Sequence, residues 1–375
     1  MILRKLSIAA LSVLAAAAAL SSCKKDEEDT ASAPYLTGNP KFSVDRYVEA
    51  GSRHTFTAEE VTNPTGAEVK YSWTVTRGGK TVIDGETSET DGGRTFEYAF
   101  EGVNQKDTLC NFRVSCSTSA TGYSGTSYSA DVTTVSDKSL TTEGDSPLSG
   151  SVSESEVTDP RDSRTYRTII VNGLEWTAEN LAYSGQGGTL GRPLEDAEAA
   201  SGIFGRLYKW SEATEVCEGL GNGWRLPTVE DWNNLGSFLK KSGEAQGLTA
   251  GWAGINGKIM TNIYFNGNEM WEYWPDVVIT NESGFSAIPL GYATVVEKEF
   301  SGSADDIWTF AGFSEYAGFW TSTGYTAGQE PGTGDDPESK KAYYVYIYEN
   351  NDDLRLNYVD KTAFALPVRG VRDSQ

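Results

Sequence analysis

Trp176, Glu179 and Asn180 form one short group of residues that could bind a ligand. An aromatic ring can stack on a sugar, and carboxylate and amide groups can hydrogen-bond to its hydroxyls. The alternative is a buried structural motif, in which Glu179 and Asn180 satisfy backbone groups, as buried polar side chains must. We favour the structural interpretation and keep the three residues as a possible ligand-binding site.

A second group, Tyr344, Tyr346 and Tyr348, alternates along a predicted strand, so the three rings should share one face. Such a face could be a platform for a sugar or a peptide, because tyrosine is common at interfaces. It could equally be cross-strand aromatic packing within the sheet. The sequence leaves both interpretations open.

Acidic side chains are plentiful, but no pattern selects a pair placed for glycoside hydrolysis. Asp335 and Asp336, and then Asp352 and Asp353, collect oxygen ligands in predicted loops, as calcium prefers. Neither pair belongs to a full EF-hand loop, and Asp is an ordinary turn residue. These four are weak calcium candidates, and the sequence predicts no metal site and no cofactor.

The number of histidines and the positions of the cysteines exclude several kinds of catalytic and metal site. His54 is the single histidine, which excludes His-based triads and multi-histidine zinc sites. Cys110 and Cys116 would lie about 20 Å apart in an extended strand. A disulfide needs Cα atoms within roughly 7 Å, so we expect two buried thiols. Cys217 lies near a predicted helix C-terminus, where the dipole disfavours a reactive thiolate. The sequence therefore predicts no enzyme.

The N-terminus has the pattern of a secretory signal peptide. Two basic residues precede an apolar run over 6–20, which is too short to span a membrane. The next residues, Leu20-Ser21-Ser22-Cys23, resemble the lipobox of bacterial lipoproteins, whose cysteine is acylated and becomes the mature N-terminus. We expect a signal peptide over 1–22 and a membrane anchor through a lipid on Cys23.

Residues 23–34 follow as a lipidated acidic tether. Residues 24–29 are all charged, and like charges keep a tether extended. An acidic run just after the lipid cysteine resembles the surface-export signal of lipoproteins in the Bacteroidota. We therefore expect lipid anchoring in the outer membrane, facing the cell exterior; a spacer facing the periplasm is the alternative.

Charge and composition narrow the partners. Lys and Arg number 31 against 53 Asp and Glu, a net charge of −22 in 375 residues. Such a chain repels phosphate backbones, so nucleic acid is not expected as a partner. The length predicts two domains. The 10 Trp, 19 Tyr and 40 Gly indicate short strands and tight turns around aromatic anchors.

The first domain, 35–135, is predicted to be all-β. Alternating segments with turn signals predict strands at 42–44, 55–58, 69–75, 81–83, 95–100, 109–116 and 128–135. About seven short strands around Trp73 suggest an Ig-like sandwich that is similar to PKD-like domains, with Trp73 in the core. Residues 136–160 are rich in Ser, Thr, Asp, Glu and Gly and are predicted to be a flexible linker.

The second domain, 161–375, is predicted to be α+β. Thr228 can cap a helix that carries Asp231 three residues on, as in a capping box, and Gly243 ends that helical pattern. A shorter helix is expected over 209–217. Strands at 342–348, 354–358 and 365–371 should end the chain. Two helices early and a hairpin-rich sheet late are typical of an α+β domain.

Six motifs follow in order through the second domain. They lie at 165–169 with 174–181, 205–210, 223–228 with Trp232, 284–287, 319–323 and 368–373. Together they resemble the Fibrobacter succinogenes major paralogous domain over nearly all of 161–375. The resemblance implies a C-type-lectin-like fold, distantly similar to formylglycine-generating enzymes, and a place at the bacterial cell surface. It implies no activity, because fold does not fix function.

The chain departs from that family at two positions. Family members commonly pair a cysteine before the Gly-Trp motif with one in the final motif, but this chain has Cys217 and Gly370. The resemblance thus implies that this disulfide is absent. A glutamate that often follows the Trp-Thr-Ser-Thr motif is Gly324 here, which removes any site that uses that carboxylate.

The sequence thus favours a non-enzymatic, surface-displayed binding or adhesion module for a glycan or a surface protein. A structural or assembly component of a surface complex is the alternative. A hydrolytic enzyme is less favoured, because it would need clustered acids or a reactive thiol.

Overall fold

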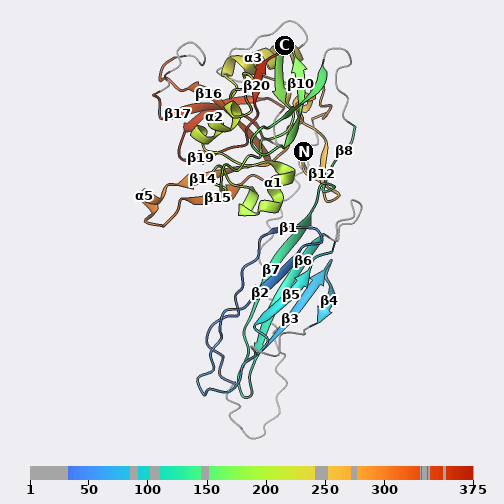
Figure 1. The fold of residues 1–375 in the computed structure, drawn as a ribbon, viewed down its shortest axis with the longest axis vertical. Coiled ribbons are helices and arrows are strands. Elements are labelled where there is room, and N and C mark those ends of the chain that lie inside the picture. The colour runs from blue at the N-terminus through green and yellow to red at the C-terminus, as the bar shows by residue number, and fades with distance from the viewer. Residues whose placement is uncertain are drawn as a thin grey trace, which may run out of the picture.

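The computed structural model describes residues 33–84, 92–101, 110–144, 152–240, 252–271, 277–329, 331, 336, 338–348 and 352–374 (Figure 1). Strands far exceed helices in it, and they form several separate sheets. We keep the names first domain for 35–135 and second domain for 161–374. Figure 1 shows the first domain as an elongated body below the wider second domain.

Two sheets make up the first domain. Five strands pair in the order β1-β7-β6-β3-β4, and β2 pairs with β5 beside them. The strands are β1 (Tyr47–Glu49), β2 (Arg53–Thr57), β3 (Lys70–Arg77), β4 (Lys80–Asp84), β5 (Thr95–Ala99), β6 (Asn111–Ser119) and β7 (Ser127–Val135). Six of the seven expected strands are therefore confirmed. The strand expected at 42–44 is wrong, because Phe42 leaves the ladder and packs its ring 4.9 Å from that of Trp73.

The core between the two sheets is aromatic. Trp73 on β3 is fully buried, stacks on Phe96 of β5 at 5.3 Å, and donates its indole N–H to the carbonyl of Gly93. The prediction that Trp73 is a core residue is confirmed. Cys110 and Cys116 are buried thiols, as expected, because they lie on the inward face of the alternating β6 segment.

The flexible linker predicted for 136–160 is wrong where the structure describes it, at 136–144 and 152–160. Strand β8 (Leu140–Thr142) pairs with β12 (Ile263–Phe265), and β9 (Ser153–Thr158) pairs with β10 (Thr165–Val171). Sheet pairing uses backbone groups, so a polar segment can add to a sheet edge. In β9 only the Val157 side chain is buried, which explains why composition indicated no strand.

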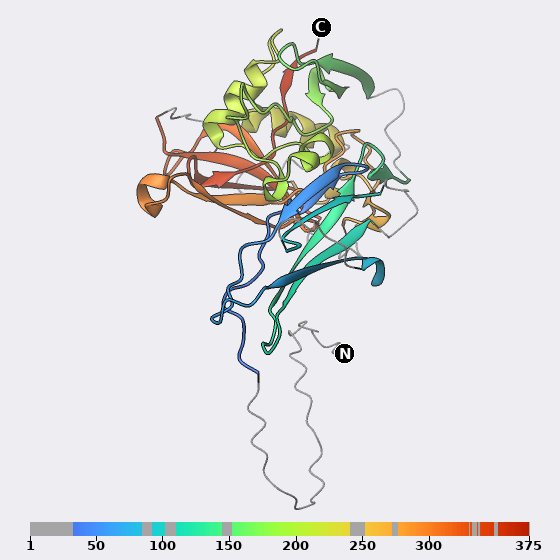
Figure 2. The ribbon, with the colours of Figure 1, turned by 60° about the horizontal axis from the view of Figure 1, so that its bottom comes forward.

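The described part of the second domain combines four small sheets with five short α-helices and one 3-10 helix. The sheet orders are β20-β11-β10-β9, β13-β12-β8, β15-β14-β19 and β16-β17-β18. The remaining strands are β11 (Leu174–Thr177), β13 (Asn268–Glu269), β14 (Tyr292–Val296), β15 (Ile307–Ala311), β16 (Tyr316–Gly324), β17 (Lys341–Tyr348), β18 (Arg355–Asp360), β19 (Phe364–Ala365) and β20 (Val371–Asp373). Figure 2 shows the yellow-green helices above most of the orange and red strands, while the red strand next to the C-terminus lies at the top.

Helices in the second domain follow their sequence signals. The helical segments are η1 (Leu194–Asp196), α1 (Glu198–Phe204), α2 (Trp210–Glu218), α3 (Val229–Leu239), α4 (Asn256–Ile259) and α5 (Lys298–Ser301). Both expected helices are confirmed as α2 and α3. At α3 the Thr228 hydroxyl accepts the Asp231 N–H, and the Asp231 carboxylate accepts the Thr228 N–H. This reciprocal capping box fixes the start of the helix.

The last predicted strand, 365–371, is only partly correct. The chain forms β19, leaves regular structure over 366–370, and enters a different sheet as β20. Within that break, the carbonyls of Val368 and Gly370 accept hydrogen bonds from Leu181 and Thr177. These two carbonyls are satisfied by the end of β11 and the segment that follows it, so no continuous strand is needed.

The two domains share a packed junction. The ring of Tyr47, on β1, belongs to the main core of the second domain and lies 6.0 Å from that of Phe265. Asn266 donates its side-chain amide to the carbonyl of Thr134, 3.0 Å away. Burial raises the pKa of Tyr47 to about 12. The end of the first domain is therefore held against the second.

Candidate functional site

The first predicted group divides into core and surface residues. Trp176, on β11, is fully buried against Trp232 and Phe285, at 5.1 and 5.9 Å between ring centroids. A ring enclosed in this way has no face for a sugar, so the ligand-binding interpretation is wrong for Trp176. Asn180 is also buried and donates to the Phe204 carbonyl. Only Glu179 is partly exposed, and it pairs with Arg167.

Arg369 joins three of the sequence motifs. Its guanidinium is 1% exposed and donates to the carbonyls of Thr177, Phe285 and Ser286 and to the side-chain oxygen of Asn180. Burial lowers the pKa of Arg369 to about 9, which still leaves it protonated at neutral pH. The sequence reasoning missed this residue, although the motif at 368–373 contains it.

A cavity of about 230 Å³ lies beside this guanidinium. We call it the Arg369 pocket. Glu179 and Asn180 belong to it, so two of the three residues first singled out do line a hollow. Its walls come from the β8 segment, the segment after β11, α1, β12 and the motif at 284–287: Leu140, Thr142, Arg164, Arg167, Ala178, Glu179, Asn180, Gly202, Ile203, Phe204, Thr261, Ile263, Ser286, Ile288 and Arg369.

A larger and more polar cavity, of about 370 Å³, lies at the start of α1. We call it the Trp308 pocket. Its lining comes from the loop at 188–193, the starts of α1 and α2, and β15: Gly188, Thr189, Gly191, Arg192, Pro193, Asp196, Glu198, Arg206, Lys209, Glu212, Asp306 and Trp308. None of these residues was predicted as a site.

Each charged side chain that lines the Trp308 pocket forms an ion pair or a hydrogen bond with another group of the protein. Arg206, 3% exposed, binds both carboxylate oxygens of Glu198 at 2.8 Å and the carbonyls of Leu190 and Gly191. Two further ion pairs cross the pocket, between Arg192 and Asp196 and between Lys209 and Asp306. The lining thus carries three cations and four carboxylates in a nearly balanced set.

The pKa values of two carboxylates in this pocket are shifted in opposite directions. Burial raises the pKa of Glu212, whose carboxylate accepts the Lys209 N–H at 2.8 Å. The hydrogen bond from the Lys209 ammonium lowers the pKa of Asp306. Such opposite environments are typical of functional sites and also of structural ion pairs. Here each acid has a fixed protein partner.

The backbone beside the Trp308 pocket is strained. Glu195 and Asp196 have φ values of 52° and 58°, in the left-handed region that glycine normally occupies. Two consecutive non-glycine residues in this region cost of order 1–3 kcal/mol each. The Asp196 carboxylate forms an ion pair with Arg192. Strain of this kind clusters at binding sites, which marks this rim as a candidate site.

The only signal for the Trp308 pocket in the sequence is the motif at 205–210, which supplies Arg206 and Lys209. Trp308 and Asp306 lie about a hundred residues further on, in a segment that matches no motif. Their approach to Arg206 is a property of the tertiary fold, so no local pattern could have indicated the pocket.

The tyrosines of β17 share one face, as predicted. Tyr346 stacks on Tyr316 of β16 at 5.6 Å, and Tyr344 lies 6.3 Å from Trp320. Burial is the main cause that raises the pKa of Tyr344. Tyr348 is 37% exposed at the end of the row. Cross-strand packing therefore accounts for Tyr344 and Tyr346, whereas Tyr348 keeps an accessible ring.

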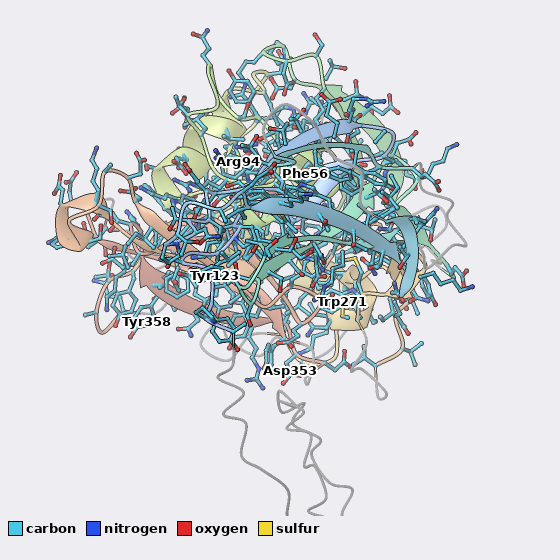
Figure 3. The ribbon with its side chains drawn as sticks, turned by 90° about the horizontal axis from the view of Figure 1, so that it is seen from below. Phe56, Arg94, Tyr123, Trp271, Asp353 and Tyr358 are labelled. Atoms are coloured by element: carbon cyan, nitrogen blue, oxygen red, sulfur yellow. The ribbon has the colours of Figure 1, made fainter. Side chains whose placement is uncertain are left out.

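The calcium candidates do not assemble. Asp335 lies outside the described residues, and Asp336 accepts the Glu338 N–H. Asp353 (Figure 3) accepts the Gly254 N–H, while the Asp352 carbonyl accepts those of Ile255 and Asn256. In the described ranges no three or more His, Cys, Asp or Glu side chains are grouped so as to hold a metal. The two aspartates instead fasten the loop before α4.

Cys217 is a buried thiol at the end of α2, and burial raises its pKa. Its sulfur lies 3.8 Å from the carbonyl of Arg369, next to Gly370. A side chain at Gly370 would meet the Trp224 ring at 3.1 Å. The position where the resembling family has its second cysteine is thus close to Cys217, and in this chain it is a glycine that lies against the Trp224 ring.

Cys23 and the rest of 1–32 lie outside the described residues, so the lipid anchor stays a prediction. Among the helices that are described, none combines the length and the apolar character needed to cross a bilayer.

Comparison with known proteins gives one result for the second domain. The family model of the Fibrobacter succinogenes major domain matches residues 169–372. This range contains every residue that lines the Trp308 pocket and most of those that line the Arg369 pocket. No curated protein matches the chain significantly in sequence.

Proposed function

Since the chain belongs to the Fibrobacter succinogenes major domain family, we propose that this domain serves as a non-enzymatic binding module, and that the Trp308 pocket binds a carbohydrate. The single observation that carries the proposal is the composition of this pocket. It places a partly buried indole ring beside a balanced, hydrogen-bonded set of acids and bases.

The arrangement suits a neutral, hydroxyl-rich ligand. Fixed carboxylates accept hydrogen bonds from sugar hydroxyls, and guanidinium and ammonium groups donate to them. Because their partners already hold these side chains, little ordering is needed when a ligand binds. The Arg192 guanidinium lies 5.3 Å from the centre of the Trp308 ring and orients it. Aromatic rings then supply stacking area with a defined direction.

Binding is favoured over hydrolysis by the same contacts. A glycosidase needs one carboxylate ready to attack or to activate water and one ready to protonate. In this pocket Asp306 is held by Lys209 and by the Lys298 N–H, and Glu198 by Arg206. Turnover of a bound oligosaccharide by the purified protein would contradict this part of the proposal.

Glycan-array screening followed by calorimetry tests the proposal. Trp308→Ala should weaken the best ligand at least tenfold, a loss of about 1.4 kcal/mol in binding free energy. Tyr358→Ala is the matched control, because Tyr358 (labelled in Figure 3) is 39% exposed and is not among the residues that line the pocket. Equal affinities for Trp308→Ala and wild type, or no glycan hit at all, would contradict the assignment.

The proposed setting is the outer face of the outer membrane, with a lipid on Cys23. In this setting the first domain acts as an Ig-like, PKD-like spacer, supported by its two sheets around Trp73. The second domain has a C-type-lectin-like architecture, supported by the family match. Protease shaving of intact cells should remove the wild-type protein. An accessible, membrane-retained pool that persists in Cys23→Ala would overturn the anchor.

A role in assembly is the second candidate, favoured by the hairpin of β14 and β15. Near its α5 tip, Val296, Phe300 and Ile307 are 47%, 79% and 45% exposed, and Val296 pairs directly with Ile307. Clustered exposed apolar side chains mark interaction sites. Under this candidate, cross-linking on cells should capture a stoichiometric partner chain with wild type and not with Phe300→Asp.

A further inference from the structure

Each of the two pockets contains one buried arginine, but only one of them has a carboxylate partner. Arg206 in the Trp308 pocket binds Glu198. Arg369 hydrogen-bonds to three carbonyls and one amide oxygen, and no carboxylate among the described residues forms an ion pair with it. Glu179, the acid that lines the same pocket, is paired with Arg167. A buried charge without an opposite charge is costly.

The guanidinium also retains capacity to donate. An arginine has five N–H donors. Arg369 uses Nε once, Nη1 twice and Nη2 once within the described residues. One Nη2 donor is therefore left, on a side chain that lines the cavity. An anionic oxygen in the cavity would take this donor and offset the buried charge.

The charge of the lining favours an anion. Three arginines, Arg164, Arg167 and Arg369, face a single acid, Glu179, which gives a net formal charge of +2. The chain as a whole carries −22. This local excess of positive charge in an acidic protein sets the Arg369 pocket apart from its surroundings.

The wall also has an apolar part, and the cavity is small. Leu140, Ile203, Phe204, Ile263 and Ile288 line it together with polar side chains such as Thr142 and Ser286. The volume of about 230 Å³ is below the range of about 300–1,000 Å³ that is typical of pockets for drug-sized ligands. A small molecule with one anionic end and a short apolar body would fill it.

We propose that the Arg369 pocket is a binding site for a small organic carboxylate, such as a short-chain fatty acid or an aromatic acid. The carboxylate lies against the free Nη2 donor of Arg369, with Arg164 and Arg167 as further cations, and the apolar body contacts Leu140 and Ile288. This site is separate from the carbohydrate pocket, so either assignment can fail alone.

Binding of a ligand in the Arg369 pocket should also stabilise β8, because β8 residues line that pocket. Leu140 and Thr142 come from the segment between the domains, which is held to β12 by backbone hydrogen bonds. A ligand that contacts Leu140 binds only when β8 is paired. By mass action it must therefore protect β8 against local opening.

Calorimetry on the full chain with hexanoate and benzoate, against hexanamide and benzamide, tests the site. The acids should bind, and the neutral amides should bind at least tenfold more weakly. Hydrogen exchange of residues 140–142 should slow at least threefold with hexanoate present. Equal binding of acids and amides, or no binding of either acid at millimolar concentration, would overturn the proposal; equal binding of acetate would overturn its apolar part.

Variants that remove one positive charge distinguish specific binding in the Arg369 pocket from nonspecific electrostatic attraction of the carboxylate to the protein surface. Arg167→Gln should weaken hexanoate about two- to fivefold, because an exposed charge contributes modestly. Arg113→Gln is the matched control: Arg113 is 58% exposed and paired with Asp131, as Arg167 is 54% exposed and paired with Glu179. Arg369→Lys should weaken hexanoate more than tenfold. Loss of affinity in Arg113→Gln equal to that in Arg167→Gln would contradict the site.

Discussion

The Trp308 pocket and the Arg369 pocket take residues from opposite ends of α1, and the two differ in how the charge of a buried arginine is compensated. Both enclose an arginine that is almost fully buried, and in both the guanidinium binds carbonyls of loops that are distant in sequence. Arg206 is neutralised by Glu198, whose own side chain is 72% exposed. Among the described residues, Arg369 has no such acid. A buried cation can thus be compensated by a carboxylate of the protein or, as proposed for Arg369, by the anionic group of a ligand.

The difference also changes what each arginine contributes to the fold. Arg206 ties one loop, at 190–191, to the start of α1. Arg369 ties the segment after β11, the motif at 284–287 and the end of the chain to one another. Because Arg369 serves three segments, its removal should affect the whole second domain, whereas removal of Arg206 should act locally.

The largest effect is expected for Arg369→Met. The change leaves the carbonyls of Thr177, Phe285 and Ser286 buried without a donor, so the free energy of unfolding should fall by about 3–5 kcal/mol. Urea denaturation followed by tryptophan fluorescence measures this. A loss below about 1 kcal/mol would mean that the three segments are held together mainly by packing.

A smaller effect is expected for Arg206→Met. Two carbonyls lose their donor, but Glu198 stays in solvent and keeps its hydration, so the loss should be about 1–3 kcal/mol. The same denaturation experiment compares the two variants directly. If Arg206→Met proved the more damaging, the contrast drawn between the compensated and the uncompensated arginine would be wrong.

The smallest expected effect is a dependence of stability on pH, and it involves Glu212, which lines the Trp308 pocket and not the Arg369 pocket. Burial raises the pKa of Glu212 above its ordinary 4.5. The folded state then holds its proton more tightly, so this contribution to stability is full below pH 4.5 and is lost as the pH rises through the raised folded pKa. Glu212→Gln should therefore gain stability relative to wild type over that window. Thermal melts from pH 4 to pH 8 test this, and a constant difference would contradict it.

Local patterns predicted local structure well. The capping box of Thr228 and Asp231 and the alternation of β6 depend on near neighbours, and the structure confirms both. Trp176 was ambiguous because the sequence does not show which face of β11 is covered; Trp232 and Phe285 decide that from a distance. The polar strands β8 and β9 were missed because backbone pairing leaves little mark on composition.

The candidate sites were the least predictable part. Glu179 and Asn180 were singled out from a motif, and they do line a pocket, but the charge that distinguishes it is on Arg369, near the other end of the chain. Trp308 and Arg206 meet only through the tertiary fold. One sequence alone does not indicate which residues that lie far apart in the chain come into contact.

Strand β8 also determines how the molecule carries mechanical load. A pull on residue 33 enters the first domain and leaves it along β7, and the next element on that path is β8, held to β12 by a few backbone bonds. The Tyr47 ring, set into the second domain beside Phe265, takes part of the same force. Because Leu140 and Thr142 of β8 also line the Arg369 pocket, separation of β8 from β12 under load would open that pocket, whereas the Trp308 pocket takes no residue from β8.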